Sequence, residues 1–181
     1  MKTNPKDFAH PFAPILKAVE ANMQVLIYLR QYELMYAFAR LQEFYENPVL
    51  ATKHFTRQEL QDISPDYYVK WNGCNVPWDV VMNFRETFAD LDQHEEALLS
   101  FVTPGLYLVG IHFESGSEAG ETLRHERAHA AFHADCGYRM RLEAEAVRPR
   151  NRKPLKAAYG ALERMGYAKG VLLDEYQAYA V

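Results

Sequence analysis

Residues 105–134 read GLYLVGIHFESGSEAGETLRHERAHAAFHA and contain the two clearest structural signals in the chain. The apolar run 105–113 is rich in β-branched and aromatic residues, which is typical of a strand. A polar segment rich in glycine and serine follows and predicts a loop. Residues 118–134 then predict a long helix. A strand, a short loop and a helix in this order are the centre of the predicted fold.

Two histidines lie four residues apart in the predicted helix, within the sequence HERAH. The side chains of His125 and His129 therefore share one helix face, about one turn apart. Two imidazole nitrogens at this separation suit one tetrahedral zinc ion, with bonds of about 2.0–2.1 Å. Glu126 lies beside such an ion, where its carboxylate can take a proton from a zinc-bound water. The alternative interpretation is a charged, solvated helix that carries two histidines by chance.

A catalytic zinc needs a third protein ligand, and several downstream residues are candidates for this role. His133 lies one turn too far along the helix and is expected to be a polar neighbour. Asp135 has the spacing of a known third ligand, but that pattern needs a glycine where this chain has Phe132. Glu143 and Glu145 are more typical of a solvated helix face. None of these residues is therefore the preferred ligand.

Glu175 is the preferred third ligand. It lies in LLDEYQAYAV, residues 172–181, which predicts a short helix near the C-terminus. Ala178 is one turn further on and would leave room for the histidine helix to pack closely. A carboxylate from a separate helix completes a zinc site with two histidines and one glutamate. The alternative for Glu175 alone is an ordinary acidic residue near a helix start, favoured by the helix dipole.

HERAH followed at a distance by DEYQAY resembles the gluzincin branch of the zincin metallopeptidases, and within it a small bacterial type. The resemblance covers His125–His129 and extends to residues 105–113 and 174–179. It implies a zincin-like fold and a bound Zn²⁺. It further implies that His125, His129 and Glu175 are the metal ligands and that Glu126 is the general base.

The chain departs from the large gluzincins after the third ligand. Those enzymes place a long subdomain there, with a residue that orients the substrate, whereas only six residues follow Glu175. The group that stabilises the transition state must then come from elsewhere. Tyr138, Tyr167 and Tyr179 are the phenols near the predicted site, and the sequence does not distinguish among them. The C-terminal carboxylate of Val181 is a further speculative contributor.

The remaining segments indicate an α+β fold. Residues 23–29 fit a buried strand or part of a long helix, and a short strand is expected within 67–77, before a turn at Asn72-Gly73. Thr56 and Glu59 form a capping-box pattern at the start of a short helix. Helices are predicted over residues 33–46, 55–64, 77–91, 92–102, 137–147, 155–165 and 171–181. We expect a small, mostly antiparallel sheet packed on helices, with the HERAH helix beneath an edge strand formed by residues 105–113.

Composition limits the possible partners. The 181 residues suit one domain, 1–181, whose first 14 residues form an irregular arm rich in proline. Net charge is −4, so no strong field favours nucleic acid or an anionic membrane. The apolar run 23–29 is too short to span a bilayer, and no signal peptide is expected. Two cysteines make no disulfide framework, and this favours the cytoplasm.

Two further stretches have both a structural and a functional interpretation. WNGCNVPW, residues 71–78, would line a cleft or form a tight turn with its tryptophans in the core, and the core is preferred. Cys74 is expected to be a buried structural thiol. RPRNRKP, residues 148–154, would bind phosphates or act as a solvated basic linker, and the linker is preferred.

The sequence thus predicts a zinc-dependent metallopeptidase whose substrate is a peptide or protein. A metal-activated water attacks the carbonyl, with Glu126 as general base. The alternative is a non-catalytic interaction module stabilised by zinc, in which a fourth protein ligand such as Asp174 closes the site.

Overall fold

A four-stranded sheet forms the centre of the computed structural model, which describes residues 12–65, 71–114 and 118–180. The strands are β1 (Leu16–Glu20), β2 (Met23–Tyr28), β3 (Gly73–Val76) and β4 (Tyr107–His112), in the spatial order β1-β2-β4-β3. β1 and β2 pair antiparallel, β2 and β4 pair parallel, and β3 and β4 pair antiparallel. The expected α+β class is confirmed. The sheet is mixed, with antiparallel pairing in two of its three ladders.

The position of β4 corrects the prediction of an edge strand. β4 lies between β2 and β3, and all six of its residues are buried. A strand that is apolar on both faces belongs in the middle of a sheet covered on both sides. The edge strand beside the histidine helix is β3, which has only four residues. Of the expected turn at Asn72-Gly73, only Asn72 is a bend, because Gly73 is already the first residue of β3. The strand expected before this turn falls mostly on residues 66–70, which lie outside the described residues.

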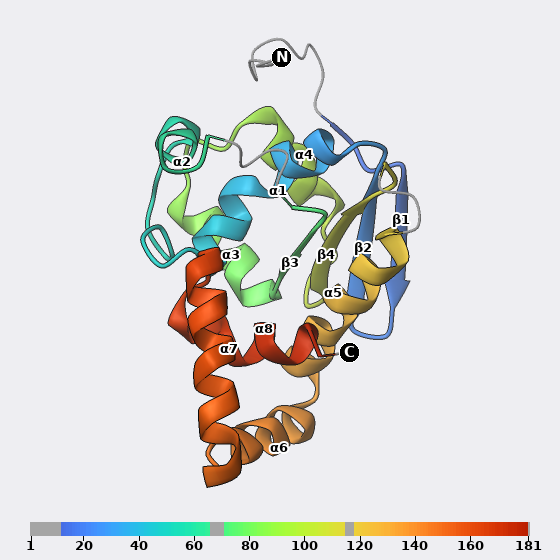
Figure 1. The fold of residues 1–181 in the computed structure, drawn as a ribbon. Coiled ribbons are helices and arrows are strands. Elements are labelled where there is room, and N and C mark those ends of the chain that lie inside the picture. The colour runs from blue at the N-terminus through green and yellow to red at the C-terminus, as the bar shows by residue number, and fades with distance from the viewer. Residues whose placement is uncertain (1–11, 66–70, 115–117, 181) are drawn as a thin grey trace.

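The described part of the chain forms eight α-helices (Figure 1). They are α1 (Gln31–Glu46), α2 (Arg57–Ile63), α3 (Trp78–Thr87), α4 (Gln93–Phe101), α5 (Glu118–Ala134), α6 (Cys136–Ala146), α7 (Arg152–Met165) and α8 (Leu172–Ala178). The predicted capping box is present, since Glu59 N donates to the Thr56 hydroxyl and Thr56 N donates to the Glu59 carboxylate. Residues 23–28 form a strand rather than part of a helix.

The two faces of the sheet are covered by different helices. Alternate residues of β4 point to opposite faces, as in any strand. Leu108 packs in the core formed with α1, α3 and α4, whereas Val109 packs with Ala130 of α5. Gly110 faces α1 so closely that a Cβ there would lie 2.6 Å from Leu34 Cδ1. The sheet therefore fixes α1 and α5 on opposite sides, and the β3 edge lies between them.

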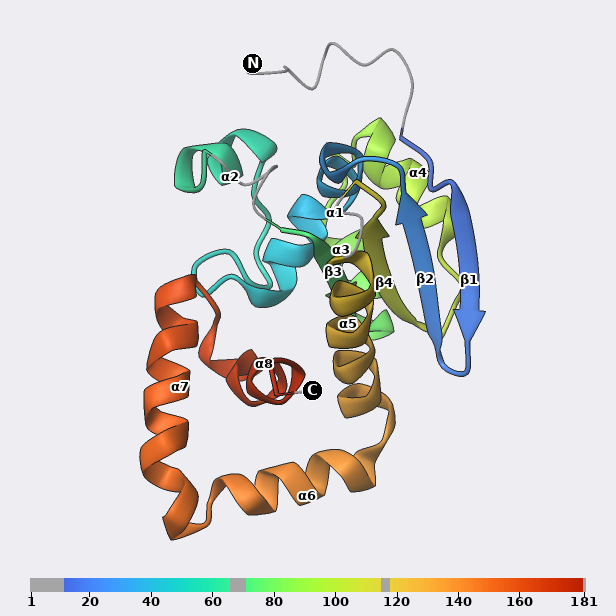
Figure 2. The same cartoon turned by 45° about the vertical axis from the view of Figure 1, so that its right-hand side comes forward.

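The C-terminal helices bring α8 back to α5. α6 and α7 lead away from the sheet and return, and α8 lies between α7 and α5 (Figure 2). The segment 148–154 is a largely exposed connection between α6 and α7, as expected of a solvated linker, but it is not irregular, since it forms a 3₁₀ turn at Pro149–Asn151 and the start of α7. A second 3₁₀ turn, Lys169–Val171, leads into α8. This path places Glu175 against the histidine helix.

Of the expected N-terminal arm, only residues 12–14 are described, and they have no regular structure. Among the described helices, none combines the length and apolarity needed to cross a lipid bilayer.

Candidate metal centre

His125, His129 and Glu175 come together where α5 meets α8. One ligand atom from each lies within 4.8 Å of the other two. The two Nε2 atoms are 3.2 Å apart, and His129 Nε2 lies 3.6 Å from Glu175 Oε1. Two nitrogens bound to one tetrahedral zinc ion would be about 3.3–3.4 Å apart, given bonds of about 2.0–2.1 Å. The structure thus places all three predicted ligands together at a spacing that suits a divalent cation.

Both histidine rings are held from behind by α8. His129 Nδ1 is 2.8 Å from Asp174 Oδ1, and the His125 ring is hydrogen-bonded to the backbone of Ala178. Metal-binding histidines usually make such a bond through the second ring nitrogen, because it fixes the ring and directs the other nitrogen to the metal. The 2 % exposure of Ala178 reflects the close contact of α8 with α5 that its small side chain allows.

Asp174 connects the candidate ligands to a wider polar network. Its second oxygen, Oδ2, is 3.0 Å from His133 Nε2, and Gln177 Nε2 donates to Oδ1. His133 Nε2 also lies 2.9 Å from the Tyr45 hydroxyl. Burial favours a raised pKa for Asp174, but the bonds and charges of the two histidines hold it below its usual value. Asp174 is therefore an ionised group that orients His129 and does not face the metal position.

The electrostatics of the two histidines differ sharply. Burial and the neighbouring His129 lower the pKa of His125 to about 4. Burial alone would also lower the pKa of His129, but the hydrogen bond and charge of Asp174, with Glu175 and Glu126 nearby, raise it to about 10. The surrounding carboxylates therefore favour the protonated, positively charged form of His129, as expected where several carboxylates could surround a cation.

Glu175 and Glu126 are buried carboxylates with raised pKa values. Burial is the main cause in both and raises each pKa to about 7. Each has an Oε2 atom with no hydrogen-bond partner among the described residues. Buried polar atoms in proteins are nearly always paired, so such atoms require an explanation. A cation beside Glu175 and a water beside Glu126 would provide one.

Glu126 is held against the edge strand β3 by Asn75. The Asn75 side chain is hydrogen-bonded to Glu126, and Asn75 Oδ1 accepts a hydrogen bond from the Tyr107 hydroxyl. A Cβ at residue 73 would clash with the Glu126 carboxylate and lie 2.6 Å from Thr122 Cγ2, so only glycine permits this approach. The sequence analysis did not predict roles for Gly73 and Asn75. The helix motif indicates the base but not the strand that positions it.

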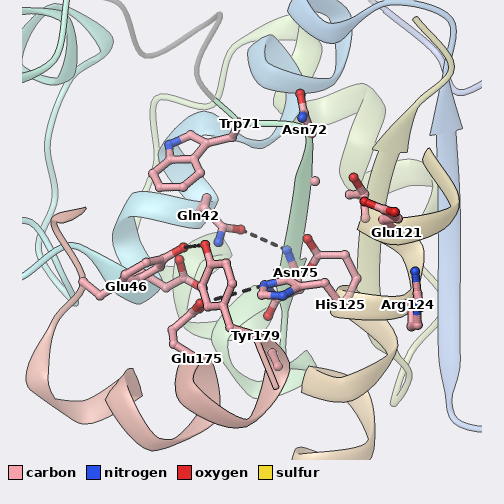
Figure 3. A pocket seen from close by; sticks show the side chains of 15 residues that line it. Gln42, Glu46, Trp71, Asn72, Asn75, Glu121, Arg124, His125, Glu175 and Tyr179 are labelled. Carbon is pink, nitrogen blue, oxygen red and sulfur yellow. Dashed lines mark hydrogen bonds and ion pairs between the residues drawn. The ribbon is translucent and has the colours of Figure 1, made fainter. Parts of the chain in front are cut away.

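A cleft of about 620 Å³ opens over these groups (Figure 3). Trp71, Asn72 and Gly73 form one wall, so the preferred placement of WNGCNVPW in the core is only partly right. Trp71 does contact the core, and Cys74 is fully buried as expected. Residues from α1, α5 and α8 complete the lining. The cleft gives a substrate access to the candidate metal position.

The structure reduces the choice among the three tyrosines. Tyr138 OH donates to Gln177 Oε1 at 2.9 Å and does not line the cleft. Tyr167 and Tyr179 both line it, and their hydroxyl oxygens are 3.4 Å apart. The Tyr179 ring packs on the His125 ring, with centroids 4.6 Å apart. Tyr179 is thus the more exposed phenol beside the metal position. Val181 lies outside the described residues.

The other ligand candidates lie elsewhere, as the sequence predicted. Asp135 caps α6 by accepting from Tyr138 N. Glu143 and Glu145 are on the exposed side of α6, where they pair with nearby arginines. α1 contributes Gln42 and Glu46 to the cleft, although no pattern in the sequence indicates this. Both are buried, at 7 % and 8 % exposure.

No protein-family model, no curated protein and no solved structure matches this chain.

Proposed function

We propose that the protein is a zinc-dependent metallopeptidase of the gluzincin type. His125, His129 and Glu175 would hold the ion, and Glu126 would act as the general base. The observation that carries this proposal is that ligand atoms of all three residues lie within 4.8 Å of one another beneath an accessible cleft. They come from two helices, and Glu175 is 46 residues from His129 and 50 residues from His125 in the sequence. The zincin-like fold and the cytoplasmic location belong to the same proposal.

The chain's own groups would act in a defined order. A bound zinc ion would supply Lewis-acid activation of the water and of the scissile carbonyl. Glu126 would accept the proton of the attacking water and deliver it to the leaving amine. Asn75 and Gly73 keep its carboxylate at the edge of β3, facing the cleft. Tyr179 is the phenol placed to donate to the oxygen on which charge develops.

The position of Asp174 favours an enzyme over a closed structural site. A zinc-stabilised module would use a fourth protein ligand, and Asp174 was the candidate. Instead, Asp174 Oδ1 contacts His129 Nδ1 and Asp174 Oδ2 contacts His133 Nε2. Asp174 thus lies behind the His129 ring, on the side away from the proposed ion. Among the described residues, the candidate metal-binding group has three members, and two of them, His125 and Glu175, line the cleft. This arrangement supports an open coordination position.

The test is a comparison of zinc content and turnover in a single variant. Glu126→Gln should keep about one zinc per chain and lose peptide hydrolysis by about 10²–10⁴-fold, the usual contribution of a general base. Hydrolysis is followed by mass spectrometry on a mixed peptide library. Glu143→Gln, an exposed change on α6, is the matched control and should behave as the parent. Full turnover in Glu126→Gln would reject the mechanism.

A further inference from the structure

We propose that Glu46 forms a subsite that binds an ammonium group of the substrate, next to the metal ligands. The ammonium can come from a free N-terminus or from a lysine side chain. This inference rests on the proposed function only in that both assign the cleft to the substrate. It adds a substrate class, namely peptides with a positive charge close to the scissile bond.

Glu46 is a buried carboxyl group that faces the cleft. It is the last residue of α1 and 8 % exposed, and it lines the cleft together with Glu175. Figure 3 shows Glu46 and Glu175 on the same side of the cleft, opposite Arg124. The side chain therefore ends in the cavity rather than in the apolar core or in bulk solvent.

No basic side chain pairs with Glu46 in the described part of the molecule. The neighbours that affect its charge are the carboxylates of Glu175 and Glu126 and the His129 ring. Arg124, on the opposite wall, is the one lysine or arginine among the residues lining the cleft. Buried carboxylates are rarely found without a cationic partner, because desolvation of the charge is costly. A cation that arrives with the substrate would supply that partner.

The carboxyl group is held in place by Gln42. Asn75 N donates to Gln42 Oε1 at 3.1 Å, which fixes the orientation of the amide. The amide NH₂ is then left to bond with Glu46, to which Gln42 is hydrogen-bonded. This support is typical of a binding group that is positioned before its ligand arrives. Burial and Glu175 raise the pKa of Glu46 well above its usual value, and an adjacent ammonium would favour the charged form.

The walls around Glu46 also suit an alkylammonium group. The rings of Trp71 and Tyr167 line the same cleft, with centroids 5.9 Å apart. Aromatic faces attract ammonium groups through their negative π surface and also cover the methylene chain of a lysine. Glu46 does not belong to the group of side chains whose ligand atoms meet within 4.8 Å. We therefore assign it to the substrate and not to the metal.

The experiment measures peptide binding by calorimetry to the zinc-loaded Glu126→Gln variant, which is not expected to cleave the ligand. Three probes are compared: alanyl-phenylalanine amide, acetyl-lysyl-phenylalanine amide and acetyl-norleucyl-phenylalanine amide. The first carries an N-terminal ammonium, the second a side-chain ammonium, and the third none. At least one ammonium peptide should bind about 10-fold to 100-fold more tightly than the norleucine peptide, as for a buried charge-assisted contact.

The added change Glu46→Gln should remove this preference while zinc content stays at the parent level. Glu121→Gln is the matched control, because it removes the same charge from an exposed position in the same cleft and should keep the preference. Equal binding of all three probes to the variant that retains Glu46 would overturn the subsite, and so would an ammonium preference that survives Glu46→Gln. Loss of zinc in Glu46→Gln would instead show that Glu46 is a metal ligand and would reject its assignment to the substrate.

The result separates this inference from the proposed function. An ammonium preference that depends on Glu46, in a protein without peptide hydrolysis, would keep the subsite and reject the enzyme. Hydrolysis of peptides without any preference for the ammonium would keep the proposed enzyme and reject the subsite.

Discussion

Two buried ionic clusters in this protein are built in opposite ways. Near α4, Arg40 Nε donates to Glu95 Oε1 at 2.7 Å, and its NH2 group donates to Glu95 Oε2 at 2.5 Å. The remaining guanidinium nitrogen bonds with the Phe55 carbonyl and Asp90. At the cleft, Glu46, Glu126 and Glu175 are buried without any lysine or arginine beside them among the described residues.

This difference in charge pairing bears on the role of each cluster. In the cluster around Arg40, the carboxylate of Glu95 faces two guanidinium groups of the same chain, those of Arg40 and Arg57, as expected of a structural ion pair. The cleft cluster has two carboxylate oxygens without partners, raised carboxyl pKa values and a cavity above it. The same chain is able to pair its buried charges, so the unpaired carboxylate oxygens support the proposal that this site binds a cation from outside.

The largest expected effect is on the paired cluster. Arg40→Met should lower the free energy of unfolding by about 3–5 kcal/mol, because Glu95 is left buried and without its main partner. Zinc affinity should not change, since Arg40 lies outside the cleft. Thermal unfolding followed by circular dichroism measures the first quantity, and calorimetric zinc titration measures the second. An Arg40→Met protein with an unchanged free energy of unfolding would contradict the structural role of this cluster.

The next effect is on zinc binding. Glu175→Gln should weaken zinc affinity by more than the roughly 100-fold that loss of an outer partner causes, because a direct ligand is removed. The stability of the metal-free protein should not fall, since the change removes a buried carboxyl group with an unpaired oxygen. Competition with a chelating dye gives the affinity. Unchanged affinity would mean that Glu175 is not a ligand.

A smaller effect is expected from the residue behind His129. Asp174→Asn keeps the shape of the side chain but loses its charge, so His129 is held less firmly. Zinc affinity should fall by about 10-fold to 100-fold, less than for Glu175→Gln. The same dye competition measures it, with Asp79→Asn on α3 as the control. A loss as large as that for Glu175→Gln would favour direct ligation by Asp174.

The smallest expected effect is a dependence of stability on pH. The pKa of His129 is raised to about 10 in the fold, against about 6.5 when unfolded. The stabilisation from protonated His129 is therefore complete below pH 6.5 and is lost as the pH rises toward 10. Metal-free protein should unfold at a lower temperature at pH 9 than at pH 7. The zinc-loaded protein should lack this contribution, because a metal ligand must be unprotonated. If the unfolding temperature fell equally between pH 7 and pH 9 for the metal-free and the zinc-loaded protein, the placement of His129 at the metal would be contradicted.

The part of the candidate site that lies on one helix can be predicted from the sequence. His125, Glu126 and His129 follow from helical periodicity. Glu175 followed from the need for a third ligand and from the small Ala178 beside it. Helices with regular hydrophobic spacing, such as α1 and α3, were also predictable.

The rest depends on contacts between distant segments. β3 has four residues and begins at an Asn-Gly pair typical of turns, so its role at the sheet edge was not visible. β4 was expected at the edge, although its apolar residues on both faces fit the centre. Glu46 ends a helix, where an acidic residue normally faces solvent. Only the path of α1 across the sheet brings it to the cleft.

The central claim is that His125, His129 and Glu175 hold one divalent cation that faces the cleft. The most direct test is a crystal structure of the zinc-loaded protein with an anomalous difference map at the zinc edge. We predict one peak about 2.0–2.2 Å from both Nε2 atoms and from a Glu175 oxygen, with a coordination position open to the cleft. A peak elsewhere, or Glu175 turned away from an ion held by the two histidines, would contradict the account.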